Sequence, residues 1–297
     1  MEEIIGFIGT GTMGKPMALN LIKAGYQLNV YDVNPMPLEE LKIKGATICL
    51  SSKEVASKSN VIITMLPNSE DVEKAILGEN GVAEGANKDC VVIDMSTIDP
   101  ISSRKISNNL SKRNIKMLDA PVSGGSWGAA SGTLAIMVGG EEDVFERCLK
   151  IFQGMGKKIF YCGPNGNGEI VKIMNNLLAG INILATGEAL SLGVKAGVNI
   201  KVLYDVINAS SGQNFAMQNY CANKAFKGDY EPGFMASLMY KDMGLAMALA
   251  KNEGVPLLIG GLGHQMYSNI VAAGFGKKDM SIFLKILEEL KNIKIRF

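Results

Sequence analysis

Lys172 and Asn176 are four residues apart in a long apolar stretch, and this spacing would place both side chains on one face of a helix. Asn175 lies beside them in the sequence. A buried lysine can accept or donate a proton during catalysis, and a neighbouring amide can position a polar substrate. An ion pair, or a lysine stem that extends toward solvent, is the structural alternative for a single lysine on such a helix.

The sequence offers few other groups for such chemistry. His264 is the only histidine, which excludes sites built from several histidines, and we expect it to be a packed helix residue or a surface residue. We predict no metal site, and we expect catalysis to depend on lysine, carboxylates, hydroxyls or a cofactor. The cysteines are scattered without a Cys-x-x-Cys pair and are expected to be buried free thiols: Cys49, Cys90, Cys148, Cys162 and Cys221.

The composition is that of an ordinary globular protein. The chain has 297 residues, 47% of them hydrophobic and 20% charged, which is enough for two domains. Its formal net charge of +1 gives no reason to expect a nucleic acid or an anionic membrane surface as a partner. Polar residues interrupt the apolar stretches before the about 20 residues that span a bilayer, and the N-terminus lacks the pattern of a signal peptide. We therefore expect a cytoplasmic protein that binds neither nucleic acid nor membrane.

A glycine-rich turn follows the first predicted strand. Residues 4–8 form a short apolar run, a G-x-G-x-x-G pattern comes next, and a helical pattern then extends to Gly25 before a second strand over residues 28–32. Such a turn lets backbone N–H groups approach a pyrophosphate at the positive end of a helix, although glycines can also serve packing alone. The residues of this turn that we expect to bind a cofactor are Gly9, Gly11, Thr12, Met13 and Gly14.

Asp32 ends the second predicted strand, 18 positions after Gly14. In dinucleotide-binding folds, an acidic residue at this place accepts hydrogen bonds from the hydroxyls of the adenosine ribose. Its charge would repel a 2′-phosphate, and residues 33–35 contain no arginine that would bind one. The sequence therefore predicts NAD as the cofactor, with NADP less favoured.

Three further strands are predicted to end at the same edge of a sheet. Apolar runs begin at residues 61, 91 and 117, and each is followed by polar or small residues. Amphipathic helices over residues 71–77 and 101–112 separate them, which is the alternation of a parallel sheet. Because the carboxyl ends of such strands face the ligand, we expect cofactor contacts from Leu66, Pro67, Ser96 and Thr97.

Two more strands, over residues 133–138 and 158–161, complete this half of the chain. Residues 1–163 are thus predicted to form an α/β domain with a Rossmann, doubly wound parallel sheet.

Ser123, Gly124 and Gly125 follow the third of these strands. Small residues in a turn expose consecutive backbone N–H groups beside a hydroxyl, which suits a carboxylate, and a plain turn at a strand end is the alternative. Trp127 follows closely and is expected either to line the same pocket or to pack partly buried. The segment is a candidate binding site for the carboxylate of a small substrate.

The second half of the chain has helical periodicity throughout. The pattern predicts helices over residues 168–196, 201–207, 214–224, 239–252, 258–273 and 280–293, and no strand. Residues 164–297 are therefore predicted to form an all-helical domain, which the first of these helices, about 44 Å long, joins to the α/β domain. In the fourth helix, Lys241 and Asp242 point about 100° apart, so we expect them to serve different faces. Lys241 either reaches the cofactor or lies at a solvated edge.

Several of these segments, in order along essentially the whole chain, resemble the β-hydroxyacid dehydrogenase family, which includes 3-hydroxyisobutyrate dehydrogenase, 2-hydroxy-3-oxopropionate reductase and 2-(hydroxymethyl)glutarate dehydrogenase. Residues 6–17 resemble the family's cofactor turn, and residues 119–125 resemble its substrate-binding signature. Residues 166–168 with Lys172 and Asn176 resemble its catalytic segment, and residues 241–242 its late cofactor-side motif. The resemblance implies a Rossmann domain, a helical domain like that of 6-phosphogluconate dehydrogenases, and a homodimer or homotetramer assembled through the helical part.

The resemblance also implies a role for each candidate residue. Imine reductases, which share this architecture, usually carry Asp or Tyr at the lysine position, so Lys172 favours a hydroxy acid substrate. The 6-phosphogluconate dehydrogenases are longer and use His and Lys together, and the absence of His from the Lys172 helix argues against that branch. The implied roles are general acid/base for Lys172, substrate positioning for Asn176 and Asn175, carboxylate binding for Ser123, Gly124 and Gly125, and contact with the nicotinamide side for Ser96 or Thr97 and for Lys241.

The expected reaction is the reversible, metal-free oxidation of a small β-hydroxy acid to its semialdehyde. Hydride passes between the carbinol carbon and the nicotinamide while Lys172 takes or returns the hydroxyl proton. An unperturbed lysine titrates at about 10.4, and burial together with the positive nicotinamide would favour its neutral form. The alternative function is an NAD-binding sensor or structural protein of the same fold, which would have no use for Lys172, Asn176 and Ser123 as a set.

Overall fold

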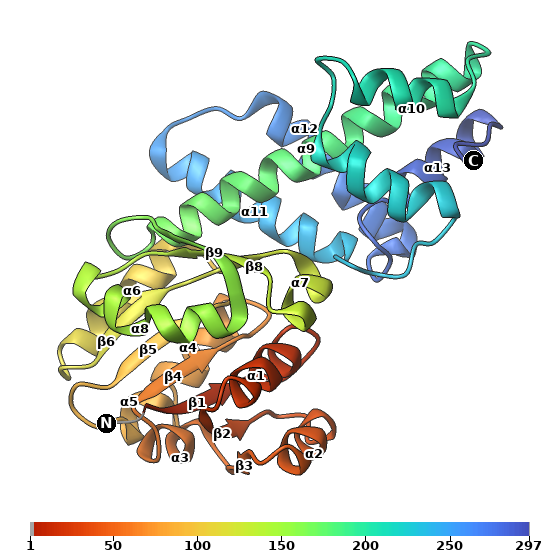
Figure 1. Ribbon diagram of the computed structural model, residues 1–297. Helices are drawn as coiled ribbons and strands as arrows, with labels where there is room; N and C mark the ends of the chain where they lie inside the picture. The colour runs from red at the N-terminus through yellow and green to blue at the C-terminus, as the bar shows by residue number, and fades with distance from the viewer. Residues whose placement is uncertain (1–2, 297) are drawn as a thin grey trace. The chain divides into compact units, whose positions relative to one another are not determined.

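The structure is a computed structural model that describes residues 3–296 (Figure 1). The chain divides into two compact units, the first ending at Lys172 and the second beginning at Ile173. The first unit holds the strands, and the second is helical.

The first unit is built on a parallel six-stranded sheet in the order β3-β2-β1-β4-β5-β6, which can be followed in Figure 1. Strands β4 and β5 are buried along their whole length, as expected where helices cover both faces of a parallel sheet. The order is that of a doubly wound dinucleotide-binding sheet, so the predicted Rossmann fold is confirmed. The strands are β1 (Ile4–Ile8), β2 (Gln27–Tyr31), β3 (Thr47–Ile48), β4 (Val61–Thr64), β5 (Val91–Asp94) and β6 (Lys116–Asp119).

Each face of this sheet has its own hydrophobic core. On one face, Met17 of α1 and Phe152 of α8 belong to the same cluster as Ile63 of β4. On the other face, Ile76 of α4 joins the cluster that contains Ile62. Adjacent residues of a strand point to opposite faces, so both must be apolar in a strand that is covered on two sides. The helices are α1 (Gly14–Lys23), α2 (Met36–Ile43), α3 (Ser52–Ser57), α4 (Ser69–Leu77), α5 (Val82–Gly85), α6 (Pro100–Ser111), α7 (Gly125–Ser131) and α8 (Glu142–Met155).

A second, three-stranded sheet follows in the order β7-β8-β9, formed by β7 (Val122–Ser123), β8 (Leu134–Val138) and β9 (Gly156–Tyr161). The two strands predicted over residues 133–138 and 158–161 therefore pair with each other, and β9 begins earlier than predicted. The short strand β7 pairs antiparallel with β8, so Ser123 lies in a strand and only the glycines after it form the turn. A bridge between Asp119 and Gly139 connects this sheet to β6.

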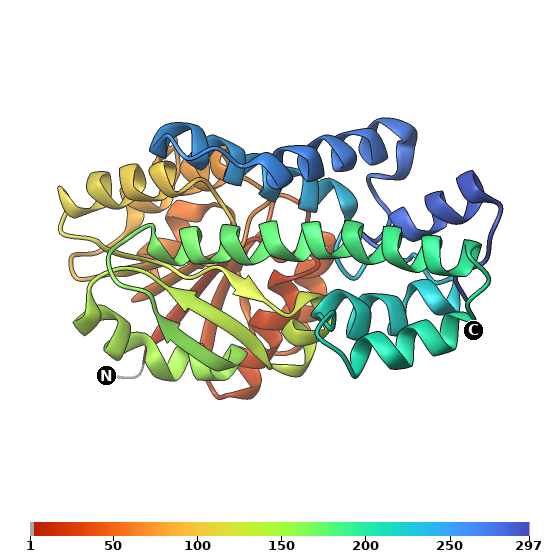
Figure 2. The ribbon, with the colours of Figure 1, turned by 90° about the horizontal axis from the view of Figure 1, so that it is seen from above.

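The helix α9 (Asn167–Lys195) begins in the first unit and continues without interruption into the second, as the green helix in Figure 2 shows. By length and composition it would be able to cross a membrane, which the sequence prediction of interrupted apolar stretches did not anticipate. Its apolar character has an explanation in packing, because Ile183 and Leu190 are buried in the core of the second unit.

The second unit packs its helices around one core that includes Met239 of α11, Tyr267 of α12 and Leu284 of α13. Within the described part of this unit no β-strand is present, and the one β-bridge joins Met235 to Asp279. The regular helices after α9 are α10 (Ile200–Asn208), α11 (Ala236–Glu253), α12 (Leu258–Ile270) and α13 (Ile282–Lys291).

Two predicted helices of the second unit differ in form from regular α-helix. The segment predicted over residues 214–224 contains the π-helical turn Ala216–Cys221, followed by a 3₁₀ turn over Ala225–Lys227. The helix predicted to reach residue 273 ends as α-helix at Ile270 and widens into the π-helical turn Val271–Phe275. Gly274 has φ +87°, a left-handed conformation that stops the helix there.

The histidine lies in the second unit, and the cysteines are distributed over both units. His264 lies on α12 and stacks on Tyr240 of α11 with ring centroids 4.6 Å apart, as expected of a packed helix residue. All five cysteines are free thiols, and four are buried. The prediction was wrong for Cys162, which is partly exposed in the loop after β9.

Candidate active site

The glycine-rich turn connects β1 to α1. A Cβ on Gly14 would overlap the carbonyl oxygen of Gly9, so the turn can close this tightly only with glycine. At Gly11, in contrast, a Cβ would meet nothing within 4 Å, and Thr12 beside it is exposed. Met13 at the N-cap makes no side-chain capping bond, so no capping side chain covers the N-terminus of α1. These features fit the pyrophosphate of a dinucleotide.

Asp32 follows β2 and is held beside this turn. Its Oδ2 accepts hydrogen bonds from the Thr10 N–H at 2.5 Å and from the Thr10 hydroxyl at 3.2 Å. Its Oδ1 accepts a bond from the Asn34 N–H at 2.8 Å. These hydrogen bonds hold the carboxylate in place. Asp32 is half-buried, so part of its surface still faces solvent. This placement suits a ribose diol and disfavours a 2′-phosphate.

The predicted cofactor residues after β4 and β5 divide into buried and accessible ones. The Ser96 hydroxyl donates to Asp94 Oδ1 at 2.6 Å, and the Leu66 N–H donates to the same hydroxyl oxygen at 2.9 Å. Ser96 is buried, and its hydroxyl joins the segments that follow the two strands. Pro67 is exposed and Thr97 is half-buried. Of the two residues predicted as alternatives, Thr97 is the more accessible to a ligand.

Asp94 and Asp119 form a pair of buried carboxylates on the neighbouring strands β5 and β6, where they are register partners. Burial raises the pKa of Asp94 to about 6, although hydrogen bonds from Ser96 and Thr64 oppose the shift. Burial also raises the pKa of Asp119, against hydrogen bonds from the backbone N–H groups of Gly166 and Glu169. The sequence prediction gave neither carboxylate a separate role.

Asp119 fixes the beginning of α9. Its Oδ1 accepts a hydrogen bond from the Gly166 N–H at 2.7 Å, and its Oδ2 accepts one from the Glu169 N–H at 3.1 Å. The side chain of Glu169 extends to the segment after β5, where Oε2 accepts a bond from the Ile98 N–H at 3.1 Å. The first turn of α9 is therefore attached to the carboxyl ends of both β5 and β6.

Lys172 lies three residues after Glu169 on this anchored helix, and its side chain is only 6% exposed. The anchoring role of Glu169 was not predicted from the sequence. The sequence shows only an acidic residue at the start of an apolar helix, and the local pattern does not indicate which group it contacts.

Ser123, Gly124 and Gly125 end β7 next to the start of α7. Ser123 is half-buried and pairs with Ala135 of β8, while Gly124 and Gly125 have φ values of +135° and +61°. The serine hydroxyl and the backbone of two glycines thus lie together at one strand end, as the carboxylate prediction requires. Trp127 is 64% exposed on α7, so the alternative in which it packs partly buried is wrong.

The remaining predicted residues lie in the second unit. The Asn176 side-chain N–H donates to Asp242 Oδ2 at 2.6 Å, and the Asn175 side-chain N–H donates to Asn176 Oδ1 at 3.0 Å. Lys241 Nζ lies 3.1 Å from Asp242 Oδ1. Asp242 is buried and Lys241 is partly exposed, as expected of side chains on different faces, but this ion pair joins their charged ends. Asp242 is only 2% exposed; the sequence prediction placed it in the late motif with Lys241 but did not predict its contact with Asn176.

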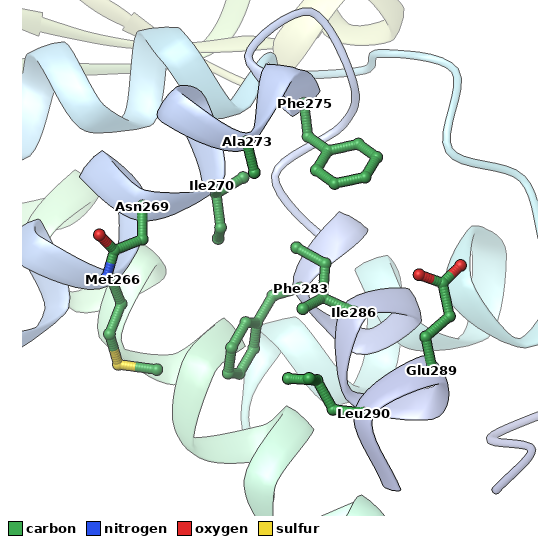
Figure 3. A pocket seen from close by; sticks show the side chains of 9 residues that line it. All are labelled: Met266, Asn269, Ile270, Ala273, Phe275, Phe283, Ile286, Glu289 and Leu290. Carbon is green, nitrogen blue, oxygen red and sulfur yellow. The ribbon is translucent and has the colours of Figure 1, made fainter. Parts of the chain in front are cut away.

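A cavity of about 480 Å³ lies elsewhere in the second unit, between α12 and α13 (Figure 3). Its walls are mostly apolar, and Asn269 and Glu289 are its polar members. None of the predicted site residues lines it, so we do not place the reaction there. Among residues 3–296, no group of three or more His, Cys, Asp or Glu side chains is arranged to hold a metal ion.

Comparison with known proteins identifies the family. Residues 4–163 match the model for the NAD binding domain of 6-phosphogluconate dehydrogenase. Residues 166–287 match the model for the NAD-binding of NADP-dependent 3-hydroxyisobutyrate dehydrogenase. A probable mitochondrial 3-hydroxyisobutyrate dehydrogenase from Dictyostelium discoideum is 43% identical over 300 residues, which cover 99% of this chain and 92% of the relative. The chain belongs to the β-hydroxyacid dehydrogenase family.

Two further relatives show the range of this β-hydroxyacid dehydrogenase family. The 2-(hydroxymethyl)glutarate dehydrogenase of Eubacterium barkeri is 39% identical, over 98% of this chain and 97% of the relative. A solved structure of Mycobacterium tuberculosis 3-hydroxyisobutyrate dehydrogenase with L-serine is 33% identical, covers 97% of this chain and 99% of its own, and superposes with a TM-score of 0.91. The predictions of an NAD-dependent oxidoreductase and of its fold are confirmed.

Proposed function

We propose that this β-hydroxyacid dehydrogenase interconverts a small β-hydroxy acid and its semialdehyde, with Lys172 as the general acid/base. The attachment of α9 to the sheet carries this proposal. Asp119 and Glu169 fix the turn before Lys172 to the carboxyl ends of β5 and β6, the sheet edge at which a dinucleotide binds in this fold. A proton-transfer group that is rigidly attached to the cofactor sheet is what a dehydrogenase needs.

The residues proposed to hold NAD are those whose geometry fits it. The open backbone at Gly11 and Thr12 would face the pyrophosphate, and Asp32 would accept hydrogen bonds from the ribose. Pro67, which is exposed, and Thr97, which is half-buried, would line the nicotinamide half. The nicotinamide of a bound cofactor would supply the hydride acceptor for oxidation and the hydride donor for reduction.

Lys172 moves the proton in this proposal. During oxidation, the neutral Lys172 amine takes the proton of the substrate hydroxyl as the C–H hydride leaves. During reduction, the Lys172 ammonium donates a hydrogen bond to the aldehyde oxygen and then transfers the proton to it. Asn176, whose amide is oriented by Asp242, positions the reacting end of the substrate with Asn175. Lys241 is proposed to contact the nicotinamide side.

Ser123, Gly124 and Gly125 are proposed to bind the substrate carboxylate. A hydroxyl and backbone N–H groups can together satisfy a carboxylate without a second positive charge near Lys172. Ser123 and Gly125 are half-buried and Gly124 is exposed, so this segment is open to a ligand.

The substrate class follows from what the ligands of the relatives have in common. 3-Hydroxyisobutyrate, 2-(hydroxymethyl)glutarate and L-serine, taken from the names of similar proteins, each carry a primary hydroxyl on the carbon next to the one that bears a carboxylate. We propose that the substrate of this enzyme contains the same HO–CH₂–CH–COO⁻ unit.

Steady-state assays test the function. Purified enzyme should oxidise at least one of these three acids with NAD⁺, or consume NADH with methylmalonate semialdehyde, tartronate semialdehyde or 2-formylglutarate. Lys172→Met should lower kcat by roughly 10²-fold or more while NADH still binds, because only the proton-transfer group is lost. Lys251→Met, at an exposed position on α11, is the matched control and should retain activity. If wild-type enzyme uses no compound of the panel, the sensor hypothesis gains support; if Lys172→Met turns over normally, the role of Lys172 is refuted.

We further propose that the enzyme is a homodimer or homotetramer. Large apolar side chains are exposed on α12, with Leu258 at 84%, Ile259 at 68% and Leu262 at 65%. Apolar patches of this kind on one helix are typical of subunit contacts. Light scattering at micromolar concentration should give two or four times the mass of one chain, and a monomer would contradict the proposal.

A further inference from the structure

The carboxylate of Glu169 is fully buried in the first turn of α9. Acidic residues are common in first helical turns, where the helix dipole stabilises them, but there they are usually in contact with water. Removing a carboxylate from water is costly unless hydrogen bonds replace those of the solvent. The Ile98 N–H supplies one such bond at 3.1 Å, across 71 residues of sequence. This contact reaches from the helix that carries Lys172 to the segment that carries Thr97.

Asp119 and Glu169 have different tasks at this junction. Asp119 binds backbone N–H groups of α9 and so attaches the helix to β6. Gly168 allows the close approach, because a Cβ there would overlap the carbonyl oxygen of Met137 on β8. Glu169 adds a side-chain bond to the Ile98 N–H, which lies beyond the end of β5. Asp119 therefore fixes the helix, and Glu169 fixes the segment after β5 to that helix.

We infer that Glu169 is a positioning residue that sets the distance between Lys172 and Thr97 by holding the backbone N–H of Ile98. The inference rests on the proposed function, in which Lys172 transfers the proton and Thr97 borders the nicotinamide. Proton and hydride leave adjacent atoms of one substrate, so the two sides of the site must keep a fixed separation. Misplacement by about 1 Å can cost about 10²-fold in rate.

The competing explanation is the charge of Glu169. Residues three apart on a helix are neighbours, so the carboxylate could act on the protonation of Lys172 instead of on the backbone. Two variants separate these roles. Glu169→Gln keeps an oxygen that can accept the Ile98 bond but removes the charge, whereas Glu169→Ala removes both.

The first measurement is backbone hydrogen exchange in the full-length enzyme with NADH bound, which needs no substrate. We expect the Ile98 N–H to exchange slowly in wild type and in Glu169→Gln, and faster in Glu169→Ala, while the Ile93 N–H within β5 stays protected in all three. Glu142→Ala, which removes an exposed carboxylate from the first turn of α8, is the matched control and should leave Ile98 unchanged. Rapid exchange of Ile98 in wild type, or unchanged exchange in Glu169→Ala, overturns the inference.

The second measurement is the single-turnover rate of NADH oxidation by a semialdehyde that the wild type accepts. We expect Glu169→Ala to be slower by about 10-fold to 10²-fold, and Glu169→Gln to stay within about threefold of wild type with an unchanged pH profile. A variant that merely loses folded protein would reduce the amplitude of the reaction and leave its rate unaltered. Equal defects in Glu169→Gln and Glu169→Ala, with a displaced pH profile, would assign the effect to charge and refute positioning.

The two measurements also separate this inference from the proposed function. Wild-type enzyme that consumes no semialdehyde refutes the function, while the exchange of Ile98 still reports whether Glu169 holds the backbone. Active wild type together with a normal rate in Glu169→Ala refutes the inference and leaves the function standing.

Discussion

Asp94 is the most informative position for a test of stability, because its carboxylate is completely buried at the end of β5. Its Oδ1 accepts hydrogen bonds from the hydroxyls of Thr64 at 2.8 Å and Ser96 at 2.6 Å. Its Oδ2 makes no hydrogen bond among the described residues. Asp94→Asn keeps an acceptor oxygen for both hydroxyls and removes a charge that lies near the buried carboxylate of Asp119.

The size and sign of the effect follow from the pKa. Burial raises the pKa of Asp94 from 3.8 to about 6. At about 1.36 kcal/mol for each pH unit, this difference corresponds to about 3 kcal/mol. Between these two pKa values the folded protein holds the proton and the unfolded chain has released it. The contribution of Asp94 to stability is therefore present below about pH 4 and is lost as the pH rises through about 6. At neutral pH the ionised Asp94 costs about 3 kcal/mol, which Asp94→Asn would recover.

Urea unfolding followed by circular dichroism at about pH 4 and about pH 7 measures this effect. The free energy of unfolding of Asp94→Asn minus that of wild type should become more positive by about 3 kcal/mol between the two conditions. Asp143→Asn, which neutralises an exposed carboxylate on α8, should show a nearly constant difference. A constant difference for Asp94→Asn as well would mean that Asp94 is not protonated in the folded protein at the lower pH, and the reasoning from burial would fail.

Three further predictions concern the cofactor, the Asn176 contact and the start of α9. Asp32→Asn should reduce the preference for NADH over NADPH, measured as a ratio of kcat/KM values, by about tenfold or more, since the repulsion of a 2′-phosphate is removed; an unchanged ratio would show that Asp32 does not select the cofactor. Asn176→Asp places a second carboxylate at the 2.6 Å contact with Asp242 and should lower the free energy of unfolding by about 2–4 kcal/mol. Adding Asp242→Asn should restore most of this loss in urea titrations, and no recovery would argue against the contact. Gly168→Ala should cost about 1–3 kcal/mol by the same method, because its Cβ meets the Met137 carbonyl; wild-type stability would mean that the junction can relax.

The sheet was predictable because its signals are local. An apolar run followed by Gly9, Gly11 and Gly14 specifies a strand, a turn and a helix within one short segment, and Asp32 closes the same unit. Lys172 was also visible from its neighbours, since a charge inside an apolar helix stands out in any single window.

The residues that hold these groups in place were not predictable in the same way. Glu169 accepts a hydrogen bond from Ile98, which is 71 residues away in the sequence, and Asp242 accepts one from Asn176, which is 66 residues away. No local pattern records which backbone N–H or amide lies opposite a carboxylate once the chain has folded. The partial exposure of Cys162 and the π-helical turn before Gly276 were not predicted either, because both depend on tertiary packing and not on local composition.

The position of Lys172 as the last residue of the first unit has a consequence for how such enzymes diversify. Exchange of the chain after this residue, by recombination or in a designed chimera, would leave the proposed proton donor on the same piece as the dinucleotide turn, Ser123 and the carboxylates at the start of α9. The exchanged part would bring its own versions of Asn176, Lys241 and Asp242. The residues proposed for NAD binding, proton transfer and carboxylate binding would thus stay together, while the residues around Asn176, Lys241 and Asp242 could change independently of them.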